Sequence, residues 1–272
     1  GAVSAWWRLG MWTYWRRTVA SIALATLALG VPAEAAVWQP AQDDPFDAQL
    51  SVPYNAVRPV KVMLLDLFSA SPARLQELKG RGVHTVCALN AGAWENWRPD
   101  SGAYDLRLVG STAGWQSDRW LDIRAEDALR PILARRLDLC KSKGFDGVAF
   151  DNTDGYAHRT GFPLTAKDQL RFNRWLAEEA HARDLAAGLM NTLELIPELG
   201  DEFDFAISES CFSADNCEPL LAFRKLGKSV FVIEYTNVTR KIDSYCAAAK
   251  DLGVQLVFKT RSLNGKLHRR CP

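Results

Sequence analysis

The chain has 272 residues, 48% of them hydrophobic, which is enough to bury one large core. Its 33 basic and 32 acidic side chains leave a formal net charge of +1. A charge so close to zero creates no long-range field, so we expect neither nucleic acid nor a membrane surface as a partner. The ten tryptophans are many for this length, and several fall in predicted loops. Exposed aromatic rings of this kind suit stacking on flat ligands such as sugars.

The first 35 residues have the features of an export signal that follows a few upstream residues. Met11 is the plausible start, and the basic pair Arg16-Arg17 precedes an apolar run over residues 19–29. Small residues at positions 33 and 35 suit signal cleavage. The apolar run is shorter than a membrane span, which favours a cleaved signal peptide over an anchor, and the arginine pair leaves a twin-arginine signal open. We therefore expect a secreted or periplasmic protein with one mature domain over residues 36–272 and no membrane attachment.

Export makes the six cysteines interpretable, because disulfides persist outside the cytosol. Two pairs are placed to close a small ring and to hold the C-terminal tail: Cys211–Cys217 and Cys246–Cys271. Cys87 and Cys140 need not be paired, since buried free thiols are unremarkable. The sequence has only four histidines and no histidine cluster, so we expect no metal and no cofactor.

Strands and helices alternate along the mature chain. We count eight strands, which include residues 60–66, 84–90, 148–150, 186–191, 203–209, 229–235 and 255–259. Helices are expected over residues 69–80, 127–143, 167–182, 219–226 and 241–252. Residues 46–51 could add one more strand, and a long loop follows residue 90. Alternation predicts a parallel sheet, and eight repeats predict an α/β fold of the (β/α)8 TIM-barrel type in a single domain.

Polar side chains end several of these strands, most clearly in the stretch FDGVAFDNTDGY over residues 145–156. The carboxylates at strand ends are Asp66, Asp151, Glu209 and Glu234, and the amides are Asn90 and Asn191. In a barrel these ends meet at one rim, where carboxylates repel one another without helping the fold. Glycoside hydrolysis uses a carboxyl pair, although a Mg²⁺ or Ca²⁺ site would also collect carboxylates. Taken alone, Asp151 would serve equally well as a helix cap.

Several long runs carry a specific resemblance. Residues 90–100 read NAGAWENWRPD, residues 119–124 read RWLDIR, and residues 144–156 contain the aspartate stretch above. Together with residues 160–165 and 203–212, they resemble glycoside hydrolase family 114, the endo-α-1,4-polygalactosaminidases and their relatives. The resemblance spans roughly residues 38–235. It implies a TIM-barrel glycosidase that cleaves α-1,4-linked galactosamine-containing polysaccharide.

The resemblance also implies roles for individual residues. The catalytic carboxyls correspond to Asp151 and Glu209. Their placement near the fourth and sixth strands is similar to that in retaining α-galactosidase-type barrels, with Asp151 as nucleophile and Glu209 as acid/base. A swap of the two roles and an inverting mechanism both stay open at this point. Residues expected to bind substrate are Asp66, Asn90, Trp94, Trp97, Trp115, Asn152, Asp154, Tyr156, Asn191 and Glu234.

The expected partner is a cationic amino-sugar polymer, cleaved internally by a monomeric enzyme. The carboxylates among the expected binding residues would suit a sugar that carries a free ammonium group. A non-catalytic carbohydrate-binding barrel is the alternative, but it would not need both Asp151 and Glu209. A metal-dependent deacetylase would need clusters of histidine and aspartate ligands, which the sequence lacks.

Overall fold

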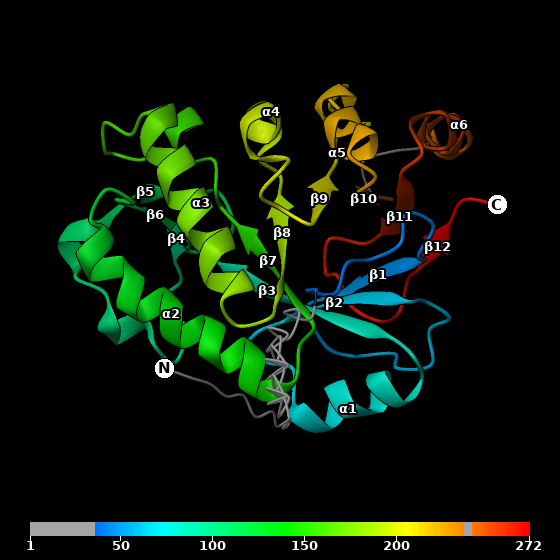
Figure 1. Ribbon diagram of the computed structural model, residues 1–272, viewed down its shortest axis with the longest axis horizontal. Coiled ribbons are helices and arrows are strands. Elements are labelled where there is room, and N and C mark those ends of the chain that lie inside the picture. The colour runs from blue at the N-terminus through cyan, green and yellow to red at the C-terminus, as the bar shows by residue number, and fades with distance from the viewer. Residues whose placement is uncertain (1–35, 237–240) are drawn as a thin grey trace, which may run out of the picture. The chain divides into compact units, whose positions relative to one another are not determined.

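The structure, a computed structural model, describes residues 36–236 and 241–272 (Figure 1). The expected signal peptide therefore lies outside the described residues. One large sheet contains nine strands, and all but the last run parallel. In spatial order they are β1 (Phe46–Gln49), β2 (Val62–Asp66), β3 (His84–Asn90), β7 (Gly147–Asp151), β8 (Ala186–Met190), β9 (Phe205–Glu209), β10 (Ser229–Tyr235), β11 (Gln255–Lys259) and β12 (Arg269–Arg270).

Helices cover the outer face of this curled sheet (Figure 1). They are α1 (Pro72–Gly80), α2 (Glu126–Lys143), α3 (Ala166–His181), α4 (Ile196–Leu199), α5 (Leu221–Lys225) and α6 (Ile242–Leu252). Local sequence explains several of their ends. Ser71 caps the first turn of α1, and Thr165 and Asp168 form a reciprocal capping box at the start of α3. α2 ends at Gly144, whose φ of 100° is readily adopted only by glycine.

The sheet closes into a (β/α)8 barrel because its first and eighth strands, β1 and β11, lie against each other. An ion pair joins them: Lys259 Nζ lies 2.6 Å from Asp47 Oδ1, and both side chains are fully buried. Inside the barrel the rings of Phe46 and Phe231 stack with their centroids 4.6 Å apart. The TIM-barrel fold expected from the sequence is confirmed, and residues 46–51, the possible extra strand, supply its first strand.

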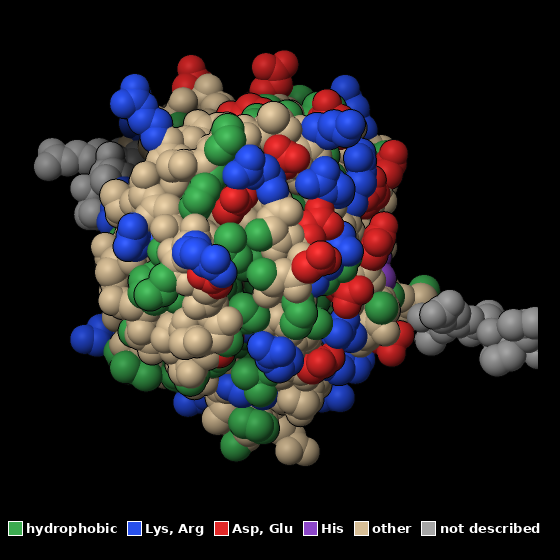
Figure 2. Space-filling view, turned by 90° about the vertical axis from the view of Figure 1, so that its left-hand side faces the viewer, with side chains coloured by type: hydrophobic (Ala, Val, Ile, Leu, Met, Phe, Trp, Pro, Cys, Tyr) green, Lys and Arg blue, Asp and Glu red, His purple; other side chains and the backbone are tan. Residues whose placement is uncertain are grey.

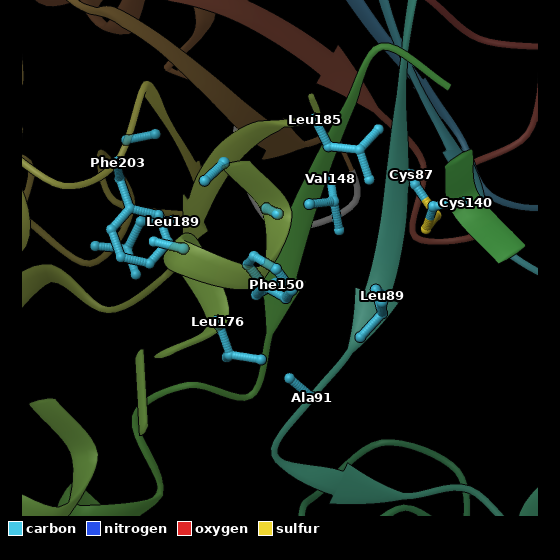
Figure 3. Packing of buried hydrophobic residues seen from close by; sticks show 14 of the residues in the cluster. Cys87, Leu89, Ala91, Cys140, Val148, Phe150, Leu176, Leu185, Leu189 and Phe203 are labelled. Carbon is cyan, nitrogen blue, oxygen red and sulfur yellow. A yellow bond between two sulfur atoms is a disulfide. The ribbon is translucent and has the colours of Figure 1, made fainter. Parts of the chain in front are cut away.

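Side chains alternate along the strands and so form two apolar layers. Val62 and Leu64 of β2 belong to the cluster inside the barrel, whereas Met63 and Leu65 pack outward toward the helices. Figure 3 shows part of the outer layer, including Phe150 of β7. The same alternation turns the carboxylate or amide that ends four of the strands toward the barrel interior at its C-terminal rim. These residues are Asp66, Asn90, Asp151 and Glu209.

The long segment after β3 contains more regular structure than the sequence indicated. Three short strands form a separate antiparallel sheet in the order β4 (Ala93–Trp94), β6 (Arg119–Leu121) and β5 (Val109–Thr112). In Figure 1 this small sheet lies near α2 and α3, at one side of the barrel. It holds the loops that carry Trp97 and Trp115, which matter for the site below.

The described part of the chain contains three disulfides and no free cysteine. Cys211–Cys217 and Cys246–Cys271 confirm the two predicted pairs. The expectation that Cys87 and Cys140 need not be paired is wrong. Cys87 points outward from β3 and Cys140 lies on the buried face of α2, so their Cα atoms come within 6.1 Å and the thiols join (Figure 3).

Basic and acidic side chains are intermingled on the face shown in Figure 2, in keeping with the small net charge. Within residues 36–236 and 241–272, no helix combines the length and the apolar character needed to cross a bilayer.

Candidate active site

A cavity of about 820 Å³ opens at the C-terminal ends of the barrel strands. The final residues of six strands line it: Asp66, Asn90, Asp151, Met190, Glu209 and Tyr235. Residues distant in sequence therefore meet in one place. This is the end of the barrel at which TIM-barrel enzymes carry their active sites.

Three neighbouring strands are followed by residues with an uncommon backbone conformation. Asn152, Asn191 and Ser210 come directly after β7, β8 and β9, with φ angles of 55°, 59° and 63°. Left-handed φ angles are rare outside glycine, and they concentrate at functional sites. All three residues line the cavity, so the sharp turns keep these side chains at the rim while the chain leaves the barrel.

The loop after β3 packs closely against one of these turns. At Gly92 an added Cβ atom would lie 1.7 Å from the Asn152 carbonyl oxygen, so a larger residue would displace the backbone. The Asn90 side chain also holds the loop and the turn at Asn152 together. Its Oδ1 accepts hydrogen bonds from Asn152 Nδ2 and from the Ala93 amide, each at 3.0 Å. Its Nδ2 donates to Asp118 Oδ2 at 3.4 Å.

Asp151 faces the cavity with little to neutralise its charge. The Asn152 amide donates to Oδ1 at 2.8 Å, and no ion pair with a cation is found within the described part of the chain. Burial and the nearby Glu209 carboxylate raise the pKa of Asp151 to about 7. The carboxyl group of Asp151 therefore holds its proton to a higher pH than an ordinary aspartate does.

Glu209 is held by the strands on both of its sides. Asn191 Nδ2 donates to Oε2 at 2.8 Å, and the Glu209 amide donates to Asn191 Oδ1 at 2.7 Å. The hydroxyl of Tyr235 donates to the other carboxyl oxygen, Oε1. Donors to both oxygens fix the plane of the carboxyl group and stabilise negative charge on it.

A second group of acidic residues lines the part of the wall near β2 and β3. Arg98 bridges two of them, with Nη2 2.7 Å from Asp66 Oδ1 and Nε 2.9 Å from Glu95 Oε2. Asp118 has no such cation partner among the described residues, and burial together with the Glu95 charge raises its pKa to about 7. In total the lining contains five carboxyl groups and two arginines, Arg98 and Arg261.

Two tryptophans stand at the edge of the cavity. Trp97 and Trp115 line it and remain 43% and 51% exposed. Large apolar side chains are rarely left so exposed without a function, and these rings can stack on sugar faces.

A family model for glycoside-hydrolase family GH114 matches residues 28–271. The chain belongs to family GH114. It is therefore a glycoside hydrolase, as its cavity with a carboxyl pair suggests. No curated protein matches the chain.

Two solved structures are similar to this GH114 barrel. The first is Ega3 of Aspergillus fumigatus, solved in complex with galactosamine, with a TM-score of 0.82 and 29% sequence identity over 88% of this chain and 100% of that one. The second is the glycoside hydrolase domain of PelA from Pseudomonas aeruginosa, with a TM-score of 0.64 and 17% identity over 83% of this chain and 97% of that one. The likeness to PelA supports the fold alone.

The structure brings most of the expected GH114 site residues together. The cavity lining includes both expected catalytic carboxyls and six of the expected binding residues, namely Asp66, Asn90, Trp97, Trp115, Asn152 and Asn191. Four other expected binding residues are absent from this lining: Trp94, Asp154, Tyr156 and Glu234.

Each of these four has another position or partner. The Trp94 indole donates to the Ser101 carbonyl at 3.1 Å, and Tyr156 packs against the outer apolar layer. Asp154 pairs with His158, 2.9 Å away.

Glu234 is fully buried, and it accepts hydrogen bonds from the Phe212 amide at 2.8 Å and from the Ser213 hydroxyl at 2.9 Å. It anchors the loop after β9. Its neighbour Tyr235 faces the cavity instead, because Phe231, Ile233 and Tyr235 occupy the inward positions of β10.

Sequence reasoning missed Tyr235, Glu95, Arg98, Asp118 and Arg261 in the lining. Counting the alternation of β10 from its apolar residues would have found Tyr235. The other four lie on loops, whose positions depend on the small antiparallel sheet and on the C-terminal segment. Within residues 36–236 and 241–272, no group of three or more His, Cys, Asp or Glu side chains is arranged to hold a metal ion.

Proposed function

We propose that this GH114 enzyme hydrolyses α-1,4-linked galactosamine-containing polysaccharide internally, with retention of anomeric configuration. One observation carries the proposal: two carboxyl groups, Asp151 and Glu209, line the same cavity, and no cation of the described residues is bound directly to either of them. Their strands are the fourth and sixth of the barrel, the layout used by retaining α-galactosidase-type barrels. The similar barrel of Ega3 holds galactosamine in its crystal structure, which supports the sugar.

In the first step Glu209 gives its proton to the bridging oxygen while the Asp151 carboxylate attacks the anomeric carbon. The bond from that carbon to the leaving sugar breaks, and a covalent glycosyl ester forms on Asp151. In the second step Glu209 takes a proton from water, the water oxygen attacks the same carbon, and the ester bond breaks. The cycle starts with the proton on Glu209 and the negative charge on Asp151, so Asp151 has to lose the proton that its raised pKa favours before it attacks.

The lining favours a cationic polymer, since it holds five carboxyl groups against two arginines. We propose Asp66, Asn90, Asn152 and Asn191 as contacts to sugar hydroxyl and amino groups. Trp97 and Trp115 would stack on sugar rings beyond the cleavage point, as an enzyme that cuts inside a chain requires. We also propose that residues 1–35 are the upstream residues and signal peptide, and that the mature enzyme works outside the cytosol as a monomer. Its three disulfides are compatible with that location.

Product analysis tests this function. The purified enzyme is incubated with a partly deacetylated α-1,4-galactosamine polymer, with its fully N-acetylated form and with an unrelated neutral glycan. We expect a ladder of short oligosaccharides from the first polymer only, and none from the Asp151→Asn variant. Release of monosaccharide alone would contradict internal cleavage. Binding of the polymer without any product would support the non-catalytic alternative.

A further inference from the structure

The carboxyl group of Glu209 accepts a hydrogen bond from the Tyr235 hydroxyl, which has no role in the mechanism proposed above. Tyr235 is the last residue of β10, and only 4% of its surface is exposed. On β10, Ile233 is paired in register with Glu209 of the adjacent strand β9. Tyr235 therefore lies two residues further toward the rim on the same face. From there its hydroxyl reaches Glu209 Oε1 and donates a hydrogen bond to it.

The Tyr235 hydroxyl donates a hydrogen bond but does not give up its proton. Burial and the charge of Glu209 raise the pKa of Tyr235 well above the usual value for a phenol. Above its ring lies the Arg261 guanidinium, 4.8 Å from the ring centroid, which partly opposes that shift. The phenol therefore keeps its proton at every pH at which the enzyme can work.

The titratable and charged groups that face Glu209 come from three neighbouring elements. Asp151 faces it from β7, Tyr235 from β10, and Arg261 follows β11 and reaches it only through the Tyr235 ring. From β8 Asn191 contributes a neutral amide. Of these groups, only Asp151 and Tyr235 act directly on the Glu209 carboxyl. Asp151 acts through its charge, whereas Tyr235 donates a hydrogen bond and keeps its proton.

We propose that Tyr235 is a positioning residue for the acid/base group, and that its hydroxyl stabilises the carboxylate left on Glu209 after the proton has been delivered. This inference rests on the proposed function above. In the first step the proton moves from Glu209 to the bridging oxygen, and negative charge appears on the oxygens that Tyr235 and Asn191 contact. The phenol proton stays on Tyr235 throughout. The hydrogen bond strengthens as charge develops, which lowers the barrier and makes Glu209 a stronger acid.

The variant Tyr235→Phe removes only the hydroxyl and tests this role. Loss of a hydrogen bond to a charged group should lower kcat on the polymer about 10- to 100-fold, with little change in KM. A weaker acid also keeps its proton to higher pH, so the alkaline limb of the pH–activity profile should move upward while the acid limb stays in place. An aryl galactosaminide with a good leaving group needs little protonation, so its hydrolysis should fall much less than that of the polymer.

Tyr104→Phe is the matched control. Tyr104 is also buried, but it lies outside the cavity lining, and no hydrogen-bond partner of its hydroxyl is found in the described part of the chain. We expect wild-type kinetics and an unchanged pH profile from this variant. The proposal is overturned if Tyr235→Phe keeps the wild-type kcat and profile, or if the acid limb moves instead. If the wild-type enzyme releases nothing from the galactosamine polymer, the proposed function itself has failed, and that result is seen before any variant is compared.

Discussion

The barrel contains two carboxylate sites with opposite treatment of their charge. At the seam between β1 and β11, Asp47 is fully buried and is bound by Lys259 at 2.6 Å and by Arg58 at 3.3 Å. At the catalytic rim, Asp151 and Glu209 face each other across the cavity with no cation in direct contact within the described residues. Both sites lie in the same barrel, so the difference in how their charge is compensated comes from their immediate surroundings.

The difference shows which acidic residues serve the fold and which serve chemistry. Burying a charge is costly unless a partner and hydrogen bonds compensate for it, and the seam supplies both. The catalytic rim leaves the charge uncompensated, so the pKa of Asp151 rises. A carboxyl pair in that state is poorly suited to stabilise a fold but well suited to transfer a proton.

The largest expected effect comes from removing the rim charges. Asp151→Asn and Glu209→Gln keep side-chain size but remove the nucleophile or the transferable proton, so each should lower kcat about 10³-fold or more. The free energy of unfolding should stay the same or rise, because the repulsion between the two carboxyls disappears. Rates on the polymer and urea unfolding curves measure both effects.

Asp138→Asn is the control, since that carboxylate is exposed, lies on α2 and is absent from the lining. It should leave the rate unchanged and lower the stability by no more than about 1 kcal/mol, the contribution of an exposed ion pair such as the one with Arg183. Near wild-type turnover in either rim variant would remove that residue from the mechanism.

The seam should show the reverse pattern. Lys259→Met leaves Asp47 buried with Arg58 as its only cation, and breaking a buried pair in this way costs about 3–5 kcal/mol of stability. The kcat of the folded fraction should not change. Urea unfolding and initial rates below the transition provide the measurement, with Lys266→Met as the exposed control. If Lys259→Met retained wild-type stability, the seam could not be described as a structural ion pair.

The pH dependence of stability should distinguish the two carboxylate sites further. Folded Asp151 keeps its proton up to about pH 7, whereas in the unfolded chain the same group loses it near 3.8. The folded state therefore binds more protons within this window, and the contribution of Asp151 to stability falls as pH rises from about 4 to about 7. The Asp151→Asn variant does not titrate there. Its free energy of unfolding relative to wild type should increase steadily with pH, and a constant difference would contradict the raised pKa.

The smallest expected effects concern the rim tryptophans. Trp97→Ala and Trp115→Ala should each raise KM about 3- to 10-fold with kcat nearly unchanged, because stacking on sugars contributes modestly to binding. Leu226→Ala removes an equally exposed apolar side chain outside the lining and should leave KM as it is. Steady-state kinetics on oligosaccharides of defined length would show which ring serves longer substrates only.

Much of this could be predicted from sequence because strands and helices are encoded locally. The apolar runs located β3, β10 and β11 at their observed bounds, and the strand-end rule led to Asp151 and Glu209. The sequence indicated Glu234, whereas the cavity lining contains its neighbour Tyr235, because a shift of one position reverses the face of a strand.

Loop residues could not be placed in the same way. Asp118 and Arg98 reach the lining through a small sheet whose strands are only two to four residues long, too short for a periodic pattern. The Cys87–Cys140 pairing was equally hidden, because it depends on how α2 packs against β3.

The central claim is that Asp151 and Glu209 act as a retaining pair, and the anomer released first tests it most directly. The enzyme is mixed with an α-1,4-linked galactosamine oligosaccharide, and the anomeric protons are followed by NMR before mutarotation equilibrates the product. A double displacement at Asp151 predicts that the α-anomer appears first and the β-anomer grows in later. A β-anomer as the first product would contradict the account and make the carboxylate at position 151 a base that activates water.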